Sequence, residues 1–454
     1  MKIFDPQNNS LTMKQLPIFF MLVLFAISCQ NETETELDTA LEARLISSSD
    51  NQSLSFFQFP ESDDLEAIPQ DPLNPLTIEK IELGKLLFHE TAFANEGEFP
   101  ITRGTYSCAT CHHSEAGFQA GLRQGIGEGG QGFGHNGDLR TRNMQCELDL
   151  VDVQPIRTPT AMNTAYQELM LWNGQFGAGG LNSGTEAQWT DDTPKEFNNL
   201  GFQGIETQAI AGMGVHRLKV DQTAIEEYGY KALFDDAFLE VNQEERYTNN
   251  TAGLAIAAYE RTLFSNQAPF QRYLEGDRTA LTDNQKKGAL LFFGEAGCVS
   301  CHSGPALNGM EFHALGMKEF EPSEVFTYNT EDPTKLGRYS FTKVESDKYK
   351  FKTPQLYNLR DVTFYGHGAS FESLTDLLWY KNKGIPENSE VDRQQLAEEF
   401  RPLGLTHEEI LQLEDFILNG LHDSNLARYV PSELPSGNCF PNNDIQSQVD
   451  LGCK

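Results

Sequence analysis

The pentapeptides Cys108-Ala109-Thr110-Cys111-His112 and Cys298-Val299-Ser300-Cys301-His302 decide how this chain folds and what it binds. The spacing Cys-x-x-Cys-His is the attachment motif of c-type haem, in which both thiols bond to the porphyrin and the histidine binds iron. A zinc site would need two further Cys or His ligands near each pair at finger-like or ribbon-like spacing, and neither pair has them. We therefore predict redox chemistry with two covalently bound haem c groups, held by Cys108, Cys111, His112, Cys298, Cys301 and His302.

The chain is strongly acidic. Its 34 Lys and Arg residues stand against 66 Asp and Glu residues, which gives a formal net charge of −32. This charge argues against nucleic acid as a partner. It would attract a basic protein such as a small soluble cytochrome, although a solvated surface without any partner explains it equally well. A length of 454 residues allows two or three domains.

The N-terminus carries an export signal. Lys14 precedes an apolar run over residues 16–27 that is too short to span a bilayer comfortably, and Ser28-Cys29 follows. A small residue before a lone cysteine resembles the lipobox of a bacterial lipoprotein, with Cys29 acylated, and an ordinary cleaved signal peptide is the alternative. We expect a signal peptide over residues 1–28, a flexible tether over 29–72, and lipid anchoring in the periplasm or at the outer membrane of a Gram-negative bacterium.

The remaining cysteines suggest one disulfide. Four of the eight cysteines belong to the haem motifs and Cys29 to the lipobox, which leaves Cys146, Cys439 and Cys453. The last two close a short loop, so we predict that they pair in an oxidising compartment. Cys146 is then a free or buried thiol.

The chain repeats itself before each motif. Gly84-Lys85-Leu86-Leu87-Phe88 precedes the first motif and Gly288-Ala289-Leu290-Leu291-Phe292 the second, each after a Leu-Thr pair. Each copy has the pattern of a helix that leads into a haem loop. We therefore predict a mainly α fold with long loops, in which two cytochrome c-like haem domains follow in tandem over residues 73–278 and 279–454.

Several further segments surround the motifs. They are residues 80–88, 157–160, 171–174, 206–209, 257–263, 269–274 and 353–360. Through these segments the chain, from about Leu76 to Tyr429, resembles the bacterial dihaem cytochrome c peroxidase family. A related dihaem enzyme that matures a tryptophan-derived quinone in another protein belongs to the same group.

The resemblance implies a cytochrome c peroxidase-type oxidoreductase. In this family the N-terminal haem reacts with hydrogen peroxide, the C-terminal haem accepts electrons from a donor such as a small cytochrome c, and a tryptophan lies between them. Trp172 matches that tryptophan, and simple packing is its alternative role. Relatives also hold calcium between the domains; here the sequence assigns no calcium ligands, and it leaves open whether the protein is a homodimer.

At the first haem the sequence departs from the family pattern. The family has Gln followed ten residues later by Glu, whereas here Gln208 is followed at that distance by Leu218. In the same stretch stand His216 and Arg217. We expect His216 to move the proton of the inner peroxide oxygen to the outer one, and Arg217 to stabilise the departing hydroxide.

Other histidines near the first motif have expected roles. Some family members carry a resting-state iron ligand in the Gly-rich loop after the motif, and His135 is the candidate here, with a solvent-exposed loop histidine as the alternative. His113 directly follows the proximal ligand, so we expect it to be exposed or to bond a haem propionate.

At the second haem the family's methionine ligand is missing. Alignment of the helix after Gly366-His367-Gly368 places Lys381 at that position, where the quinone-maturing relative has tyrosine. A lysine binds iron only when it is neutral, which burial favours. Met310 and Met317 are alternative sulfur ligands. For His313 and His367 we expect propionate or hydrogen-bonding roles.

Two other functions compete with the peroxidase. One is a dihaem oxidase of a protein or small molecule, as in the quinone-maturing relative. The other is a non-enzymatic electron carrier in which both irons are closed to reactants.

Overall fold

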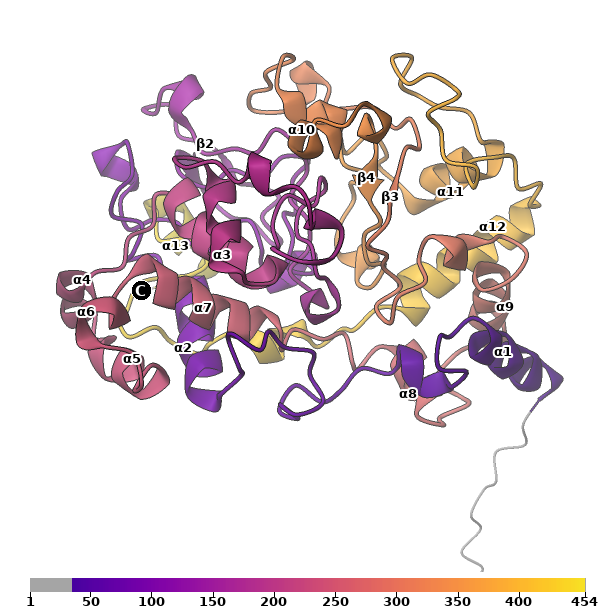
Figure 1. Cartoon of the computed structure of the whole chain (residues 1–454), viewed down its shortest axis with the longest axis horizontal. Coiled ribbons are helices and arrows are strands. Elements are labelled where there is room, and N and C mark those ends of the chain that lie inside the picture. Colours follow the sequence, from indigo (N-terminus) through magenta and orange to yellow (C-terminus); the bar gives the residue numbers. More distant parts are fainter. Residues whose placement is uncertain (1–34, 454) are drawn as a thin grey trace, which may run out of the picture. The chain divides into compact units, whose positions relative to one another are not determined.

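The computed structural model describes residues 35–453. The expected signal peptide and the lipidated Cys29 lie outside these residues. The described chain is mainly helical with long connections, as predicted (Figure 1). None of its helices is both long enough and apolar enough to cross a membrane.

The regular elements are short. The helices are α1 (Glu36–Ser47), α2 (Ile78–His89), α3 (Gly204–Val215), α4 (Gln222–Glu227), α5 (Lys231–Ala237), α6 (Gln243–Arg246), α7 (Asn249–Glu260), α8 (Pro269–Leu274), α9 (Asp283–Phe292), α10 (Tyr339–Thr342), α11 (Leu374–Lys383), α12 (His407–Asp415) and α13 (Ile445–Leu451). Two antiparallel pairs form the strands, β1 (Gly130–Gln131) with β2 (Thr141–Arg142) and β3 (Phe312–His313) with β4 (Phe351–Lys352).

The sequence repeat corresponds to a repeated helix crossing. In the first copy α2 crosses α7, and in the second α9 crosses α12. A Cβ atom on Gly84 would lie 1.8 Å from the carbonyl oxygen of Ala255, and one on Gly288 would lie 2.0 Å from that of Gln412. Each crossing therefore needs a glycine, because any side chain would collide with the partner helix.

The phenylalanine that ends each repeat has the same contact in both copies. The ring of Phe88 lies 6.4 Å from that of His112, and the ring of Phe292 lies 6.2 Å from that of His302. Each helix thus carries an aromatic side chain to the histidine of its own motif, which supports the predicted duplication.

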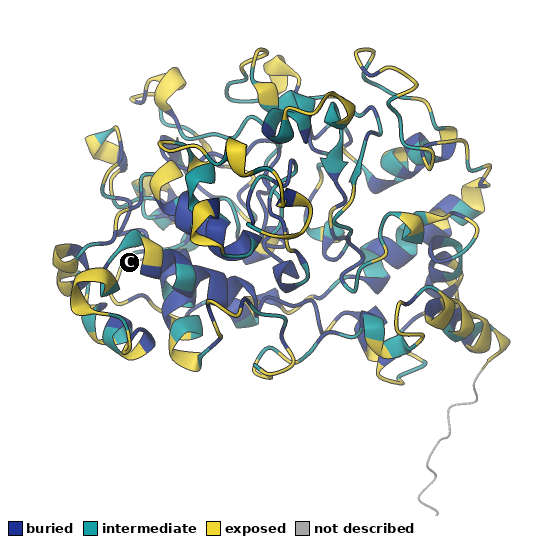
Figure 2. Cartoon of the chain, viewed as in Figure 1, coloured by how far each residue is buried: buried dark blue, intermediate teal, exposed yellow. Residues whose placement is uncertain are grey.

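Two large hydrophobic clusters form the core. One surrounds α2, α3 and α7, which Figure 2 shows largely in the colour of buried residues. The other surrounds α9, α11 and α12. The clusters agree with two haem domains, and the boundary at residues 278 and 279 stays a prediction.

The N-terminal segment is not a flexible tether from residue 35 onward. Thr35 caps α1 by accepting from the backbone N–H of Asp38, and Leu41 and Leu45 are fully buried in the cluster around α9. The buried carboxylate of Asp38 lies 2.6 Å from the Nζ of Lys286 on α9. The tether prediction is wrong for residues 35–72, because a few apolar side chains at helical spacing anchor a polar segment.

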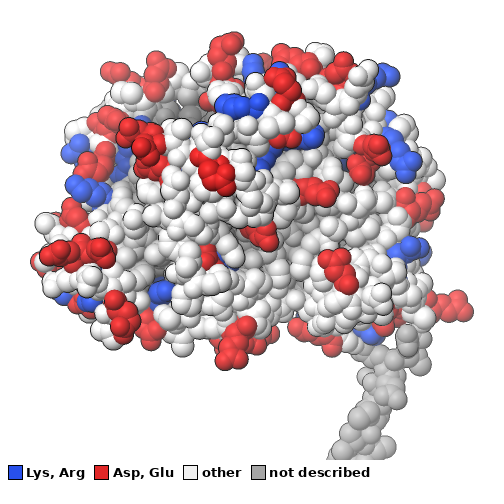
Figure 3. All heavy atoms as spheres, viewed as in Figure 1, with Lys and Arg blue, Asp and Glu red and all other residues white. Residues whose placement is uncertain are grey.

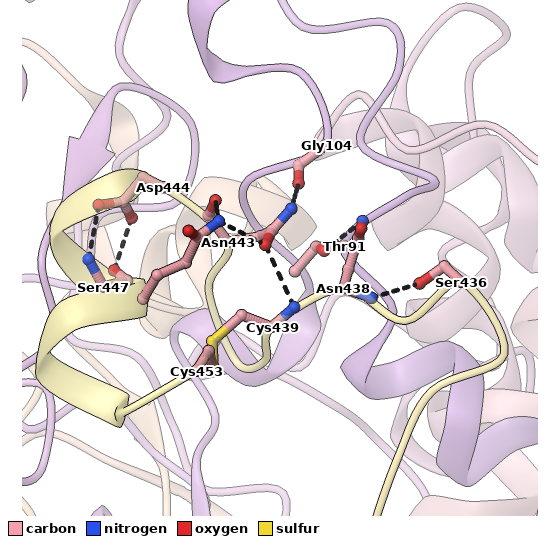
Figure 4. The surroundings of a disulfide bond; sticks show 10 residues. Thr91, Gly104, Ser436, Asn438, Cys439, Asn443, Asp444, Ser447 and Cys453 are labelled. Carbon is pink, nitrogen blue, oxygen red and sulfur yellow. Dashed lines mark hydrogen bonds between the residues drawn. A yellow bond between two sulfur atoms is a disulfide. The ribbon is translucent and has the colours of Figure 1, made fainter.

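The other end of the chain crosses to the first haem domain. We call residues 436–453 the C-terminal hook. In Figure 1 its helix α13 lies among the elements of the first half, and the carboxylate of Asp444 accepts from the backbone N–H of Gly132 at 2.9 Å. The predicted disulfide between Cys439 and Cys453 closes the hook (Figure 4), and Cys146 is a buried free thiol, as expected.

Candidate haem sites

The first motif lies in a turn that leaves its reactive groups free. Cys108–Thr110 forms one turn of 3₁₀-helix, and neither Cys108 nor Cys111 is in a disulfide. The Nδ1 of His112 is 3.2 Å from the carbonyl oxygen of Phe118. That bond assigns the ring proton to Nδ1 and leaves Nε2 to bind a metal. Burial lowers the pKa of His112 to about 4, so the imidazole is neutral.

The C-terminal hook supports this turn directly. The hydroxyls of Ser107 and Thr110 donate to the carbonyl oxygen of Pro441 at 3.0 and 3.1 Å. Next to these contacts, the amide of Asn443 donates to the carbonyl oxygen of Gly104 at 3.2 Å (Figure 4). The haem loop of the first domain is thus held by residues more than 300 positions later.

A large cavity opens beside the first motif, and we call it the first haem cavity. Its lining includes Cys108, Cys111 and His112, together with the predicted residues Gln208, His216 and Trp172. A Cβ on Gly125 would lie 3.1 Å from the Sγ of Cys111, so the backbone of the Gly-rich loop follows the cavity wall closely. Two thiols, a neutral histidine and this wall are the set of groups that c-type haem requires.

His216 is held by a carboxylate that the sequence analysis missed. Its Nδ1 is 2.7 Å from the Oδ2 of Asp152, and both residues line the first haem cavity. Burial lowers the pKa of His216, but the charge and hydrogen bond of Asp152 outweigh it and raise the pKa above the ordinary value. The pair therefore presents Nε2 to the cavity as a base.

Arg217 does not take the position expected for it. Its Nη1 is 2.5 Å from the Oε2 of the fully buried Glu128, and it does not line the first haem cavity. The backbone explains the difference, because Arg217 has a φ of 57° and its side chain therefore leaves the direction of α3. The prediction that Arg217 stabilises departing hydroxide is not supported.

The two histidines near the Gly-rich loop differ in burial from what the sequence predicts. His135 is exposed and does not line the first haem cavity, so its prediction as a resting-state iron ligand is not supported. His113 is buried, with a ring nitrogen 2.8 Å from the carbonyl oxygen of Asn136. His113 therefore fixes the loop through Nε2 and is not exposed, while its buried Nδ1 has no hydrogen-bond partner among the described residues, so the propionate role stays a prediction.

Two further polar groups face the first haem cavity. The hydroxyl of Tyr106 and the Oε2 of Glu260 are buried and have no hydrogen-bond partner among the described residues. Burial, and secondly the charge of Glu206, raise the pKa of Glu260 to about 8. Unpartnered polar atoms in a cavity wall are expected where a bound group supplies the partner. No sequence pattern marks either residue.

The second motif repeats the arrangement of the first. Cys298–Ser300 forms a 3₁₀ turn with both motif thiols free, and the Nδ1 of His302 is 2.9 Å from the carbonyl oxygen of Leu307 and 3.1 Å from that of Pro354. Burial lowers the pKa of His302 to about 4, which again leaves a neutral ligand. The second motif therefore also fits haem.

A second cavity, which we call the junction cavity, shares residues 157–160 and 170–172 of its lining with the first haem cavity. Its lining includes Pro354, whose carbonyl faces His302, and Leu377 on α11. Trp172 lines both this cavity and the first haem cavity. Its Nε1 donates to the carbonyl oxygen of Arg157 at 2.8 Å, which fixes the indole in the wall between them.

Lys381 lies one helical turn after Leu377 on α11. Residues four apart share one face of a helix, so Lys381 points to the side that Leu377 presents to the junction cavity. Burial lowers the pKa of Lys381, while the thiols of Cys298 and Cys301 act in the opposite direction. The position and the burial of Lys381 agree with its predicted role as an iron ligand, which stays a prediction.

The remaining second-domain candidates have other contacts. His367 is buried, stacks on Phe351 with ring centroids 3.7 Å apart, and has its Nε2 3.1 Å from the Oε1 of Glu319. The Sδ of Met317 would lie 3.2 Å from a Cβ on Gly366, at the edge of the junction cavity. His313 forms, with Cys301 and Glu399, the one described side-chain group with metal-binding spacing. Because Cys301 belongs to the haem motif, we do not assign this group a separate ion.

The chain was compared with known proteins. A family model described as di-haem cytochrome c peroxidase matches residues 78–279. The methylamine utilization protein MauG of Methylorubrum extorquens is 30% identical over 354 residues, which cover 78% of this chain and 81% of the relative. The cytochrome-c peroxidase IdrP1 of Pseudomonas sp. strain SCT is 29% identical over 372 residues, 77% of this chain and 82% of that protein.

A solved structure shares the fold. The crystal structure of a MauG-like protein associated with microbial copper homeostasis superposes with a TM-score of 0.55 at 20% identity and covers 81% of this chain and 95% of its own. At that identity the likeness concerns the fold alone.

Proposed function

Since the chain belongs to the di-haem cytochrome c peroxidase family, we propose that it reduces hydrogen peroxide in the first haem cavity with electrons that enter at the second motif. The observation that carries the proposal is the His216–Asp152 pair, which faces the same cavity as the first motif. Reduction of one peroxide to two waters consumes two electrons and two protons, so the site must move protons.

The residues at the first cavity supply binding and proton transfer. Haem c, covalently held by the two cysteines of each motif, would supply the iron redox chemistry. His216 takes the proton of the inner peroxide oxygen through Nε2 and returns it to the outer oxygen, while Asp152 stabilises the imidazolium that forms. Gln208 lines the same wall and orients the peroxide by hydrogen bonding.

The second motif and Trp172 serve electron delivery. Trp172 is the aromatic side chain that lines both cavities, which supports a role between the two haems. Lys381 would supply a second ligand to the iron of the C-terminal haem, in place of the family's methionine. A neutral amine is a stronger base than a thioether, so it would favour the oxidised iron more than methionine does.

A small basic cytochrome c is the proposed donor. The chain carries a net charge of −32, and Asp and Glu side chains are widely spread over the face shown in Figure 3. Opposite charge speeds the encounter of two proteins at low salt. The rate of oxidation of the donor should therefore fall steeply as ionic strength increases, and a rate independent of salt would argue against a basic partner.

We also propose that the protein is a lipoprotein of the periplasm or outer membrane. The lipobox-like Ser28-Cys29 supports anchoring, and the disulfide between Cys439 and Cys453 supports an oxidising compartment. Incorporation of labelled palmitate by the wild type, and its loss in Cys29→Ala, would establish the anchor. Equal labelling of both would exclude Cys29.

Steady-state turnover tests the proposed activity. The purified protein with two haems per chain should oxidise reduced cytochrome c only when peroxide is present. His216→Ala should lower kcat/KM for peroxide by about 10²- to 10⁴-fold, because positioned acid–base groups contribute that much. Unchanged turnover in this variant, with both haems bound, would contradict the assignment of the base.

A dihaem oxidase is the second candidate function. The observation in its favour is Lys381, which departs from the methionine of the peroxidases, as the quinone-maturing relative also does at that position. An oxidase would form a peroxide-dependent species yet turn over reduced cytochrome c poorly. An electron carrier would instead ignore peroxide.

A further inference from the structure

Two buried cations lie beside Trp172 without a carboxylate. Arg157 is 3% exposed and Lys352 is 6% exposed. Within residues 35–453, neither forms an ion pair. Arg157 donates to Gln119 Oε1 at 3.1 Å and to the carbonyl oxygens of Leu122 and Ala120 at 3.0 and 3.3 Å, and Lys352 donates to the amide oxygen of Gln167.

Both cations are fixed to the tryptophan by main-chain bonds. The indole Nε1 of Trp172 donates to the carbonyl oxygen of Arg157 at 2.8 Å, and the backbone N–H of Lys352 donates to the carbonyl oxygen of Trp172, also at 2.8 Å. Both line the junction cavity, and Arg157 also lines the first haem cavity. The two buried cations therefore flank Trp172, which lines both cavities.

Two other deeply buried cations among residues 35–453 are paired with carboxylates. Arg261 contacts Glu206 at 2.7 Å with both side chains fully buried, and Lys286 contacts Asp38 at 2.6 Å. Arg338 is buried without a carboxylate, but its guanidinium nitrogens donate to four oxygen acceptors and it lines neither cavity. Arg157 and Lys352 thus differ from the others in facing a cavity.

A buried charge without a counter-charge is unstable. Burial lowers the pKa of Lys352 to about 7 and that of Arg157 to about 10. Such groups stay charged in the interior when an anion lies next to them. An anion bound in the cavity that they line would offset the cost of burying both charges.

We propose that Arg157 and Lys352 bind haem propionates at the junction cavity, with Lys352 neutralising a propionate of the second haem. This inference rests on the proposed binding of haem at both motifs. Each haem brings two carboxylates into a site whose walls otherwise supply neutral groups at this point. A metal cation is disfavoured at the same place because it would meet two positive side chains.

The pair would position the haem edges and adjust their reduction. Arg157 and Lys352, which are both bonded to Trp172, would hold the propionates on the side of the cavity where Trp172 lies. A positive charge near the second iron favours its reduced state, because the oxidised iron carries one more positive charge. Lys352 is therefore a positioning residue that helps the second haem to accept electrons.

The test compares Lys352→Met with Lys348→Met in the full-length holoprotein. Lys348 is a half-buried lysine of the same segment that is paired with Glu345 and does not line the junction cavity, so its loss removes equal charge away from that cavity. Spectroelectrochemistry of both haems and redox-difference infrared spectra with ¹³C-labelled propionates are the measurements. We expect Lys352→Met to lower the reduction equilibrium constant of the second haem about tenfold, 59 mV for one electron, and to shift a propionate band. Lys348→Met should do neither.

A second variant and the wild type keep the inference testable if Lys352→Met matures poorly. Arg157→Gln should shift a labelled propionate band in the same experiment. In the wild type the labelled propionates should remain ionised at about pH 5, where a buried unpaired carboxyl is protonated. Unchanged bands in both variants, or protonated propionates in the wild type, would overturn the inference.

Haem content and turnover are measured on the same samples. Fewer than two haems in the wild type would reject the proposed function. Two haems without peroxide turnover would reject the peroxidase, while the propionate bands would still decide the roles of Arg157 and Lys352.

Discussion

Replacement of Asp152 by Asn tests the chemistry of the first cavity most directly. Asn keeps the shape of the side chain and removes its charge. The Nδ1 of His216 is 2.7 Å from Oδ2 of Asp152, and this carboxylate raises a pKa that burial alone would lower. In Asp152→Asn burial and the charge of Arg217 remain, and both lower the pKa of His216, so it should fall.

The strength of the interaction between His216 and Asp152 depends on how far the two side chains are exposed to water. Two unit charges about 4 Å apart interact by about 4 kcal/mol near a protein surface and about 1 kcal/mol in water. The side chain of His216 is 36% exposed and that of Asp152 is 10% exposed. An interaction between these limits, about 1.5 to 3 kcal/mol, is expected for the charged pair.

The assay is the pH dependence of kcat/KM for peroxide. His216 must be neutral to take a proton, so activity is present above its pKa and lost as the pH falls through it. Because Asp152 raises this pKa, the wild type should lose activity at a pH above the ordinary value for histidine, about 6.5. In Asp152→Asn the acid limb should move to lower pH, with a lower plateau because the neutral Asn side chain stabilises the imidazolium less than the carboxylate does.

The matched control is Asp149→Asn, a nearby and exposed carboxylate. It should leave the acid limb in place. The reasoning is refuted if Asp152→Asn, with two haems bound, has the same acid limb as the wild type, since His216 would then not be the titrating base.

Three further outcomes are expected. Trp172→Phe removes the bond to Arg157 and should lower the free energy of unfolding by about 1 kcal/mol while stopped-flow reduction of the first haem slows; an unchanged rate would assign Trp172 to packing alone. Lys381→Met should raise the midpoint potential of the second haem and change its magnetic circular dichroism, whereas the exposed Lys383→Met should change neither. The double variant Cys439→Ser/Cys453→Ser should lose about 3 kcal/mol of stability in denaturant and alter the first-haem spectrum, and an effect on the second haem instead would show that the hook acts elsewhere.

Local pattern was sufficient for much of the fold. The repeat before each motif predicted two equivalent helices, and Gly84 and Gly288 indeed lie where partner helices approach most closely. The disulfide was predictable because only two cysteines outside the motifs were close in sequence. These features depend on neighbours along the chain.

Features that depend on tertiary contacts were not predictable in the same way. Asp152 stands 64 residues before His216, and no spacing rule connects them. Arg217 directly follows His216 in the sequence, but its positive φ directs the guanidinium to Glu128 and not to the first haem cavity. Composition suggested a tether for residues 29–72, although Thr35 and Asp38 form a capping box and Leu41 and Leu45 have helical spacing. The capping box and the leucine spacing were visible in the sequence, but the polar composition of the segment led to the prediction of a tether.

Contact of the C-terminal hook with the first haem motif has a consequence for biogenesis. The hydroxyl of Thr110 donates to the carbonyl oxygen of Pro441 and is hydrogen-bonded to the side chain of Asn442, so this turn stays incomplete on the growing polypeptide until that region has been synthesised. The enzyme that attaches the first porphyrin would therefore meet an open, accessible loop. Closure of the Cys439–Cys453 bond afterwards would make that step hard to reverse.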